Sequence, residues 1–372
     1  MKRLGLIVNP IAGMGGSVGL KGTDGDDVLR QAIALGASPR AHLRASEALE
    51  ELGLHKDEIK IFAFSGDMGA SVSEGAGFRT VLLKAGGEGR RTSADDTIMA
   101  ARLMEESGVD LILFAGGDGT ARDISAALET RVPVIGIPAG VKIHSPVFAR
   151  NPLMAGKLAG LFLFGPPMGT RELEVMDIDE ESFRGGSVRA SLFGYLLVPF
   201  ERRHLQAGKS AGGKNEMVEI DGVVREVSGR MLPEKLYLVG PGSTTAAVMR
   251  HLGCEGTLLG IDAIRNGKTV GKDLSEKEIL RMIEPGNTGL IITVIGGQGF
   301  ILGRGNQQIS PEVLRIIGKK NIIIIATPSK LGSLVGKALF VDTGDRSLDR
   351  DLCGYMRIVT GLGEETVFRV DR

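Results

Sequence analysis

The sequence predicts an α/β protein, with an N-terminal domain on a parallel, doubly wound sheet and a β-rich second domain. In the first third of the chain, short apolar runs without polar alternation are separated by stretches of helical spacing, which is typical of parallel sheets covered by helices. Many of those runs end in glycine-rich turns, and glycine supplies 55 of the 372 residues, about twice the usual ~7% share. A chain of 372 residues also exceeds one domain of roughly 100–200 residues.

The N-terminal domain is expected to span residues 1–140. Its predicted strands and helices alternate along the chain. The expected strands are 4–8, 59–64, 80–83, 109–114 and 132–137, and the expected helices are 26–35, 93–107 and 121–128. In sheets of this kind, ligands bind at the loops that leave the carboxyl ends of the strands.

The second domain is expected to span residues 141–312, where the apolar pattern becomes more alternating. Residues 172–178 and 188–200 predict antiparallel strands, and 218–227 predicts a hairpin that turns at Asp221-Gly222. The tail, residues 313–372, returns to an α/β pattern with a run of four isoleucines. We therefore expect the tail to return to the first domain.

The composition of the chain narrows the classes of partner that the protein is expected to bind. Lys and Arg total 45, and so do Asp and Glu, so the chain lacks the basic surplus expected for binding nucleic acid or an anionic membrane. No apolar run approaches the ~20 residues that span a bilayer, and the N-terminal run is too short for a signal peptide. These features predict a cytoplasmic protein with small-molecule partners.

The motif at 116–120, Gly-Gly-Asp-Gly-Thr, lies between a predicted strand and a predicted helix. Gly116, Gly117 and Gly119 would let backbone amides approach a phosphate at a helix N-terminus, with Thr120 beside them. Because like charges repel, Asp118 would not bind the phosphate itself. It would act as a base for an attacking hydroxyl or as a ligand of Mg²⁺. The alternative is a tight strand–helix turn with Asp118 as N-cap.

This loop resembles the glycine-aspartate loop shared by NAD kinases, diacylglycerol and sphingosine kinases and, more loosely, 6-phosphofructokinases. The turn Asn9-Pro10-Ile11-Ala12-Gly13 and the stretch Gly242-Ser243-Thr244-Thr245-Ala246 are similar to motifs of NAD kinases. Pro138 to Lys142, Gly296 to Gly299 and Gly303 to Gln308 resemble the divergent ATP-NAD kinase-like family. The resemblance covers nearly the whole chain.

The resemblance implies a kinase that transfers a phosphoryl group from ATP or polyphosphate to the 2′-hydroxyl of NAD, with Mg²⁺ or another divalent cation. Asp118 would be catalytic. The nucleotide- or phosphate-binding residues would be Asn9, Pro10, Gly13, Gly116, Gly117, Gly119, Thr120, Gly242, Ser243, Thr244 and Thr245. By the same analogy we expect a homo-oligomer. Ala247 and Val248 stand where NAD kinases carry an aromatic residue. This departure leaves open a kinase of another small hydroxyl compound or a lipid, or a nucleotide sensor without turnover.

For the weaker candidate residues, a structural role remains as an alternative to a functional role. Gly242 to Thr245 could simply begin a capped helix. Arg304 and Asn306 suit a bound anion or a plain turn, and Asp262 suits a metal or a helix cap. The basic residues between Arg202 and Lys214 suit a phosphate clamp or a solvated loop. His144 is isolated in the sequence, and we expect it to be structural.

Overall fold

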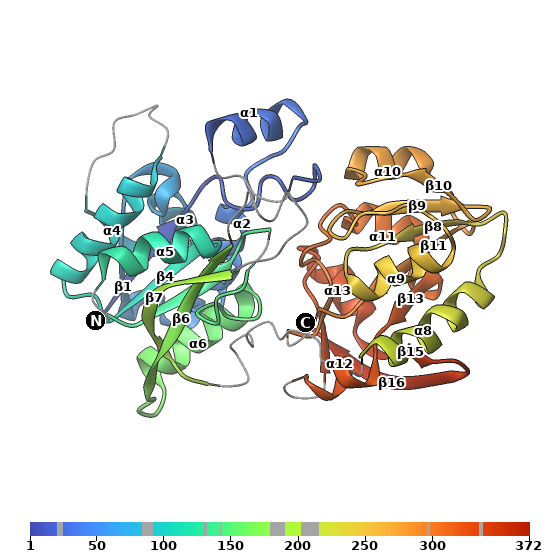
Figure 1. The fold of residues 1–372 in the computed structure, drawn as a ribbon. Coiled ribbons are helices and arrows are strands. Elements are labelled where there is room, and N and C mark those ends of the chain that lie inside the picture. The colour runs from blue at the N-terminus through green and yellow to red at the C-terminus, as the bar shows by residue number, and fades with distance from the viewer. Residues whose placement is uncertain are drawn as a thin grey trace. The chain divides into compact units, whose positions relative to one another are not determined.

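In a computed structural model of the chain, the described residues are 1–20, 25–83, 92–128, 132–141, 143–178, 190–201, 216–295, 298–334 and 338–372. The chain divides into two compact units (Figure 1). The first comprises Met1–Met14 and Lys21–Gln206, and the second comprises Gly15–Leu20 and Ala207–Arg372. Within the described residues, no helix has both the length and the apolar character needed to cross a bilayer.

The first unit contains a five-stranded parallel sheet, as the sequence predicts. Its strands are β1 (Lys2–Val8), β2 (Ile59–Ala63), β3 (Arg79–Leu82), β4 (Leu111–Gly116) and β5 (Val134–Pro138). Their spatial order is β3-β2-β1-β4-β5. The chain therefore builds outward from β1 in one direction and then, from β4, in the other. This reversal places a topological switch point between β1 and β4, where open parallel sheets bind ligands.

Helices cover the first sheet on both faces. The helical segments are α1 (Asp26–Ala34), α2 (Ala41–Glu50), η1 (Gly53–Glu58), η2 (Gly66–Met68), α3 (Ala70–Gly75), α4 (Ala94–Glu106), α5 (Asp118–Ala127) and α6 (Pro152–Phe164). The helices α2 and α6 pack on each other and over β4 and β5, whereas α4 and α5 pack together over β1 and β4. Gly156 brings α6 against α2, since a Cβ there would lie 2.1 Å from the carbonyl oxygen of Ala48.

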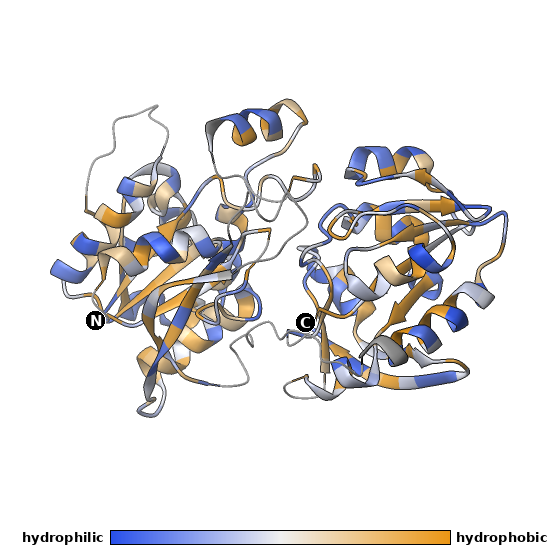
Figure 2. Cartoon of the chain, in the orientation of Figure 1, coloured by the Kyte–Doolittle hydropathy of each residue, from blue (hydrophilic) through white to orange (hydrophobic). Residues whose placement is uncertain are grey.

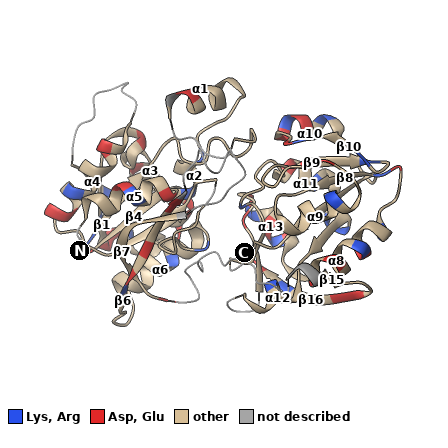
Figure 3. Ribbon diagram, in the orientation of Figure 1, with Lys and Arg blue, Asp and Glu red and all other residues tan. Residues whose placement is uncertain are grey.

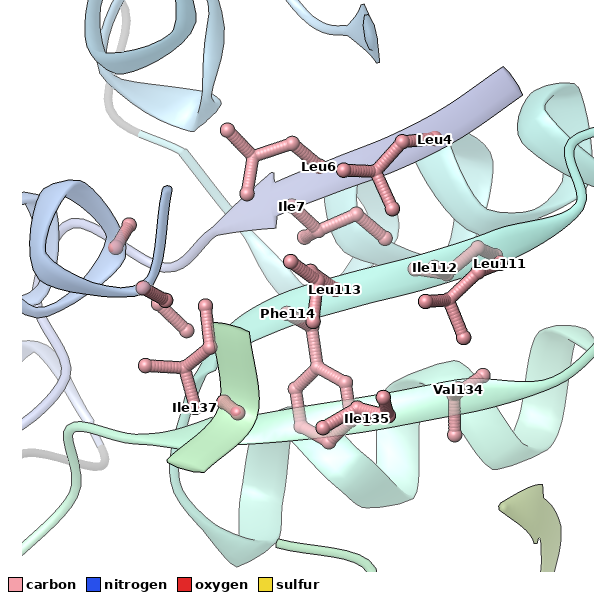
Figure 4. Close-up of a cluster of buried hydrophobic side chains, with 14 of the residues drawn as sticks. Leu4, Leu6, Ile7, Leu111, Ile112, Leu113, Phe114, Val134, Ile135 and Ile137 are labelled. Carbon is pink, nitrogen blue, oxygen red and sulfur yellow. The ribbon is translucent and has the colours of Figure 1, made fainter. Parts of the chain in front are cut away.

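Side chains of β1, β2, β4 and β5 contribute to the core of the first unit. Every residue of β4 and β5 is buried, as expected for parallel strands covered on both faces. Figure 4 shows the labelled aliphatic side chains of β1, β4 and β5 beside one another, with Phe114 among them. The ring of Phe114 meets that of Phe148 edge to face, with centroids 5.1 Å apart. This packing fixes the strands whose carboxyl ends carry the glycine-rich loops.

A two-stranded antiparallel ribbon, β6 (Thr170–Ile178) and β7 (Ala190–Pro199), completes the first unit. The sequence predicts both strands, but it assigns them to the second domain. The structure instead packs β6 and β7 on α5, and β7 also on β5. The first unit therefore extends to Gln206, not to residue 140.

The second unit is a nine-stranded mixed sheet in the order β10-β9-β8-β11-β13-β15-β16-β14-β12. Its strands are β8 (Leu236–Val239), β9 (Asp262–Arg265), β10 (Lys268–Gly271), β11 (Thr288–Thr293), β12 (Phe300–Leu302), β13 (Ile322–Ile325), β14 (Ala338–Val341), β15 (Gly354–Gly361) and β16 (Glu364–Asp371). Its helical segments are α8 (Glu216–Arg230), α9 (Ser243–His251), α10 (Glu276–Met282), α11 (Pro311–Ile317), η3 (Lys319–Asn321), α12 (Pro328–Gly332) and α13 (Arg346–Leu352). This architecture confirms the β-rich second domain that the sequence predicts.

Alternate residues of the central strands of the second unit belong to two separate cores. On β11, Leu290 and Ile292 pack into one cluster with residues of α10, α11 and α13. Ile291 packs into the other cluster with residues of α8 and α9. Figure 2 shows hydrophobic strands inside each unit and helices with mixed colouring around them. Both faces of this sheet are therefore covered, as in the first unit.

Two sequence predictions for the second unit are wrong. The tail 313–372 does not return to the first sheet, because β13 pairs with β11 and β15 pairs with β13. Of the four isoleucines, Ile324 and Ile325 are buried in the two cores of the second sheet, and Ile322 and Ile323 are half-buried against them. Residues 218–227 form part of the helix α8 and not a hairpin.

Candidate functional site at the switch point of the first sheet

Asn9 connects the loop after β1 to the first turn of α5. Its backbone N–H donates to the carbonyl of Ala115 at 2.9 Å, which extends the pairing of β1 with β4. Its side-chain Nδ2 donates to Oγ1 of Thr120 at 2.9 Å, and its Oδ1 accepts from the N–H of Ile11 at 3.2 Å. The predicted residues Asn9 and Thr120 therefore meet at the switch point, and Pro10 lies in the turn between Asn9 and Ile11.

The glycine-aspartate loop is shorter than the sequence predicts, because α5 begins at Asp118 and not at residue 121. Gly116 ends β4 and Gly117 is the N-cap, with no side chain to cap the helix. A Cβ at Gly116 would lie 2.4 Å from Oγ1 of Thr120, so only glycine fits there. The amides of the first turn have no partner within the helix, and they form the kind of N-terminus that binds anions.

A third loop, after β5, joins these two through close backbone contacts. Ala139 and Gly140 both donate their N–H to the carbonyl of Gly116 at 3.0 Å. Gly13 has a φ of +77°, and a Cβ there would lie 1.9 Å from the carbonyl oxygen of Ala139. A Cβ at Gly117 would meet the Cα of Gly140 at 3.3 Å. Three strand ends therefore converge here with backbone packed closely against backbone.

The carboxylate of Asp118 is buried and surrounded by protein donors. Oδ2 accepts from the backbone N–H of His144 at 2.7 Å and lies 3.3 Å from Nδ1 of its ring. Oδ1 accepts from the backbone N–H of Ser145 at 3.1 Å and lies 2.6 Å from its hydroxyl. Only 6% of Asp118 is exposed. The segment after β5 therefore fixes the position of this carboxylate at the start of α5.

Ser145 also ties this segment to the ribbon. Its hydroxyl lies 2.8 Å from the carbonyl oxygen of Met176 and accepts from the N–H of Met176 at 3.0 Å. Because a hydroxyl carries one proton, it donates to Asp118 or to Met176 at any one time. Next to Met176, Asp177 pairs with Arg122 of α5 at 2.7 Å. The ribbon therefore supports the geometry around Asp118.

The contacts of Asp118 determine how it could bind the expected divalent cation. Two backbone N–H groups donate to its oxygens, and Nδ1 of His144 and the hydroxyl of Ser145 also lie within 3.3 Å of them, so an ion would have to displace one of these neighbours. Across the described part of the chain, no three His, Cys, Asp or Glu side chains form a group that could hold a metal. Mg²⁺ is commonly held by one or two carboxylates together with the phosphates of the substrate. The described residues thus do not form a preformed metal cage.

The second unit has a similar strand–loop–helix junction at the predicted stretch Gly242 to Thr245. Gly242 is the N-cap of α9 with a φ of +136°, and Ser243 opens the helix. The hydroxyl of Thr245 donates to the carbonyl of Gly242 at 2.9 Å, and Nζ of Lys330 donates to Oγ1 of Thr244 at 3.1 Å. This contact places a lysine beside the first turn of α9.

The weaker candidates of the second unit have structural contacts. The side chain of Asn306 accepts from the N–H of Gly303 and donates to the carbonyl of Ile301, each at 2.9 Å, which stabilises its own loop. Arg304 lies over the ring of Phe300, 4.6 Å from the centroid, and near Asp342 at 3.8 Å. Both side chains therefore contact other residues of the second unit around the loop that follows β12.

Asp262 opens β9 and does not follow a strand end. Its carboxylate accepts from the N–H of Thr257 at 2.6 Å and of Asp273 at 3.0 Å. With only 1% of the residue exposed, it stabilises the surrounding loop. The basic segment 202–214, Lys142 and the pair Gly296-Gly297 lie outside the described residues.

Comparisons with known proteins agree with the division of the chain into two units. Residues 4–163 match the model of the ATP-NAD kinase N-terminal domain, and residues 232–370 match that of the ATP-NAD kinase C-terminal domain. A parallel α/β unit with a glycine-aspartate loop and these two matches define a class of phosphotransferases that act on an alcohol group. The chain belongs to the NAD kinase-like family.

Among curated proteins, acetoin catabolism protein X from Cupriavidus necator is 39% identical over 75 residues, which is 20% of each chain. The match thus spans only a fifth of that relative's length. Two solved structures of a putative diacylglycerol kinase from Bacillus anthracis also match, each at 18% identity with a TM-score of 0.26. They cover 48% of this chain and 45% and 41% of their own.

Sequence reasoning missed two residues of the site, His144 and Ser145. They follow Asp118 by 26 and 27 residues and belong to no recognisable motif. The only signal was position, because the segment follows the last strand of the predicted sheet, next to β4. A search for polar residues after each strand end would have found both.

Proposed function

We propose that this protein is a kinase that transfers a phosphoryl group from ATP or polyphosphate to the 2′-hydroxyl of NAD. The observation that carries the proposal is the convergence of the loops after β1, β4 and β5, with Asp118 held at the N-terminus of α5. Family matches to both NAD kinase domains support NAD as the acceptor. Phosphoryl transfer needs alignment, charge neutralisation and acceptance of the hydroxyl proton.

The residues at this edge divide these tasks. First-turn amides of α5 and the glycine backbone bind the phosphoryl oxygens of the donor. Asp118 organises the segment around the reacting hydroxyl through its contacts with His144 and Ser145. A divalent cation bound together with the donor would neutralise phosphate charge, as is general for kinases.

The test is phosphoryl transfer from ATP, and separately from polyphosphate, to NAD in the presence of Mg²⁺, read with an enzyme that responds only to NADP. We expect NADP formation, and a fall in kcat of about 10²–10⁴-fold in Asp118→Asn, with nucleotide binding within a few fold. The matched control is Asp95→Asn, which changes an exposed aspartate in the first turn of α4 and should keep full activity.

Three results would count against the proposal in different ways. A folded wild type that consumes the donor but forms no NADP would redirect the search to another hydroxyl acceptor. Nucleotide binding without any turnover would favour a sensor. Full activity in Asp118→Asn would remove Asp118 from the reacting centre.

A further inference from the structure

A pocket in the second unit contains none of the candidate site residues that the sequence analysis singles out. It has a volume of about 380 Å³, which lies within the range of pockets that hold small molecules. The end of α8, the residues that lead into β8, the end of α9 and the turn between β9 and β10 line it. All of these elements belong to the second unit, so the pocket is formed within that unit alone.

The walls of this pocket are largely apolar. Met231 and Leu252 are half-buried and pack against the buried cluster that includes residues of α8, α9 and β9. Leu232 also lines the pocket, and 63% of this residue is exposed. The N–H of Leu232 donates to the hydroxyl of Tyr237 at 3.0 Å, which fixes the loop between α8 and β8. These walls suit a short aliphatic chain, because such a chain and the exposed leucine would leave water together.

The charged side chains that line the pocket are both basic. They are Lys235 and Arg265, and no Asp or Glu lines the pocket among the described residues. Nζ of Lys235 donates to Oδ1 of Asn321 at 2.7 Å. Arg265 has one ionic partner in the described part of the chain, Glu284 at 3.8 Å, which is beyond hydrogen-bonding distance. Because both side chains of this pair are partly exposed to water, the pair is weak.

These features together suit an amphipathic anion. An arginine binds a carboxylate through two parallel N–H···O bonds, while apolar walls cover the chain attached to it. Inorganic phosphate matches this pocket poorly, because it would lose water against the apolar side chains without gaining hydrogen bonds from them. An uncharged alcohol would use the walls but not the guanidinium.

We propose that this pocket binds a small aliphatic monocarboxylate, with the carboxylate on Arg265 and the chain against Met231 and Leu252. The pocket is distinct from the predicted nucleotide-binding stretch of the same unit. Leu252 is the C-cap of α9 and Gly242 is its N-cap, so the two lie at opposite ends of a helix about 13 Å long. Binding of a carboxylate here does not depend on the proposed kinase function.

The probe is hexanoate, titrated into the full chain by isothermal titration calorimetry. We expect saturable binding, with Kd falling about threefold to fourfold for each methylene added between propionate and hexanoate. Hexanol, which lacks the charge, and inorganic phosphate, which lacks the chain, should each bind at least about tenfold more weakly. A Kd that does not change with chain length, phosphate binding as tight as that of hexanoate, or no saturable binding of hexanoate up to about 10 mM would overturn the proposal.

The variant Arg265→Gln tests the contribution of the charge. We expect its Kd for hexanoate to rise at least about tenfold, whereas its affinity for hexanol should not change. The matched control is Arg281→Gln, which changes an exposed arginine of α10 that does not line the pocket and should keep the wild-type Kd. Wild-type affinity in Arg265→Gln, or equal losses in both variants, would contradict the assignment of the carboxylate to Arg265.

A second readout places the ligand without altering the pocket. In protein labelled with ¹³C at the methionine methyl groups, we expect hexanoate to shift the signal of Met231, assigned by Met231→Leu. The signal of Met282, which packs against the other core of the second unit, should stay unchanged. A shift of Met282 without one of Met231 would place the ligand elsewhere and refute the proposal. Because neither readout measures phosphoryl transfer, failure of the proposed kinase function would leave both tests valid.

Discussion

At the scale of single residues, the candidate site depends on positions where a side chain would not fit. Gly13 combines a positive φ with a carbonyl oxygen where its Cβ would be. Gly116 has an ordinary backbone but no room, because Thr120 occupies the space. The sequence predicts both residues, and the structure adds the reason, which is the close approach of three strand ends.

Gly13→Ala should therefore damage the site more than the unfavourable backbone conformation alone would. A left-handed residue other than glycine costs about 1–2 kcal/mol, and here the carbonyl of Ala139 must also move. Gly36→Ala is the control, because Gly36 has a φ of +92° but nothing within 4 Å of the added Cβ. We expect both variants to lose stability in urea titrations, and only Gly13→Ala to lose activity. Similar activity in the two variants would contradict this assignment.

His144 shows what residue-level reasoning could not provide. A lone histidine in a loop is usually structural, and the sequence gives no sign that it meets Asp118. The contact arises because β5 lies next to β4 in the sheet. Strand order is a tertiary property, and local spacing does not encode it.

At the scale of elements, the error at 218–227 has a physical explanation. Asp-Gly between apolar residues is the usual sign of a hairpin turn. In α8, Val223, Val224 and Val227 instead share a helical face that is buried in the core. Gly222 also packs closely against the turn after β15, since a Cβ there would lie 3.2 Å from the backbone nitrogen of Leu362. Tertiary packing thus outweighed the local signal.

The cap of α13 gives a prediction at the same scale. Asp345 accepts from the N–H groups of Ser347 and Leu348 and pairs with Arg315. The hydrogen bond from Leu348 and then the contact with Arg315 lower the pKa of its carboxyl. A lowered pKa means that the carboxylate stabilises the fold above the unfolded-state value of about 3.9. That contribution disappears as the pH falls through the folded-state pKa.

Asp345→Ala should accordingly reduce the free energy of unfolding by about 1 kcal/mol at neutral pH. The difference from wild type should shrink once the pH is well below about 3.9. Urea titrations of both proteins, at neutral pH and at a pH well below about 3.9, measure this difference in the free energy of unfolding. A difference that does not change with pH would show that the charge of Asp345 is not involved.

At the scale of the whole molecule, the tail decides how the second sheet is completed. The strands β15 and β16 pair with each other, and β15 supplies Ile358 to one core and Val359 to the other. Removing β15 and β16 would expose the edge of β13 and both cores. This arrangement replaces the predicted return of 313–372 to the first domain.

Deletion of residues 354–372 should therefore remove protection from hydrogen exchange in β8, β11 and β13. Amides of β1, β4 and β5 should remain protected, because their sheet contains no strand from the tail. Val367→Ala, on an exposed position of β16, is the control and should change neither set. Loss of protection in β1 and β4 alone would support the original prediction.

The distribution of charged residues is also a property of the whole molecule. Figure 3 shows Lys and Arg interspersed with Asp and Glu in both units, in keeping with the equal totals of the sequence. In the described part of the chain, phosphate binding is thus expected at helix N-termini and glycine backbone, and not on a basic surface.

The sequence by itself determined the parallel sheet of the first unit, its glycine-rich loops and the positions of Asn9, Gly13 and Asp118. These follow from local signals: apolar runs of strand length and glycines where the backbone must turn or approach closely. Only the tertiary structure decided the order of strands, the unit to which the tail belongs, and the contact between Asp118 and His144. Those features depend on which strands become neighbours, and neighbours distant in sequence are chosen by packing of the whole core.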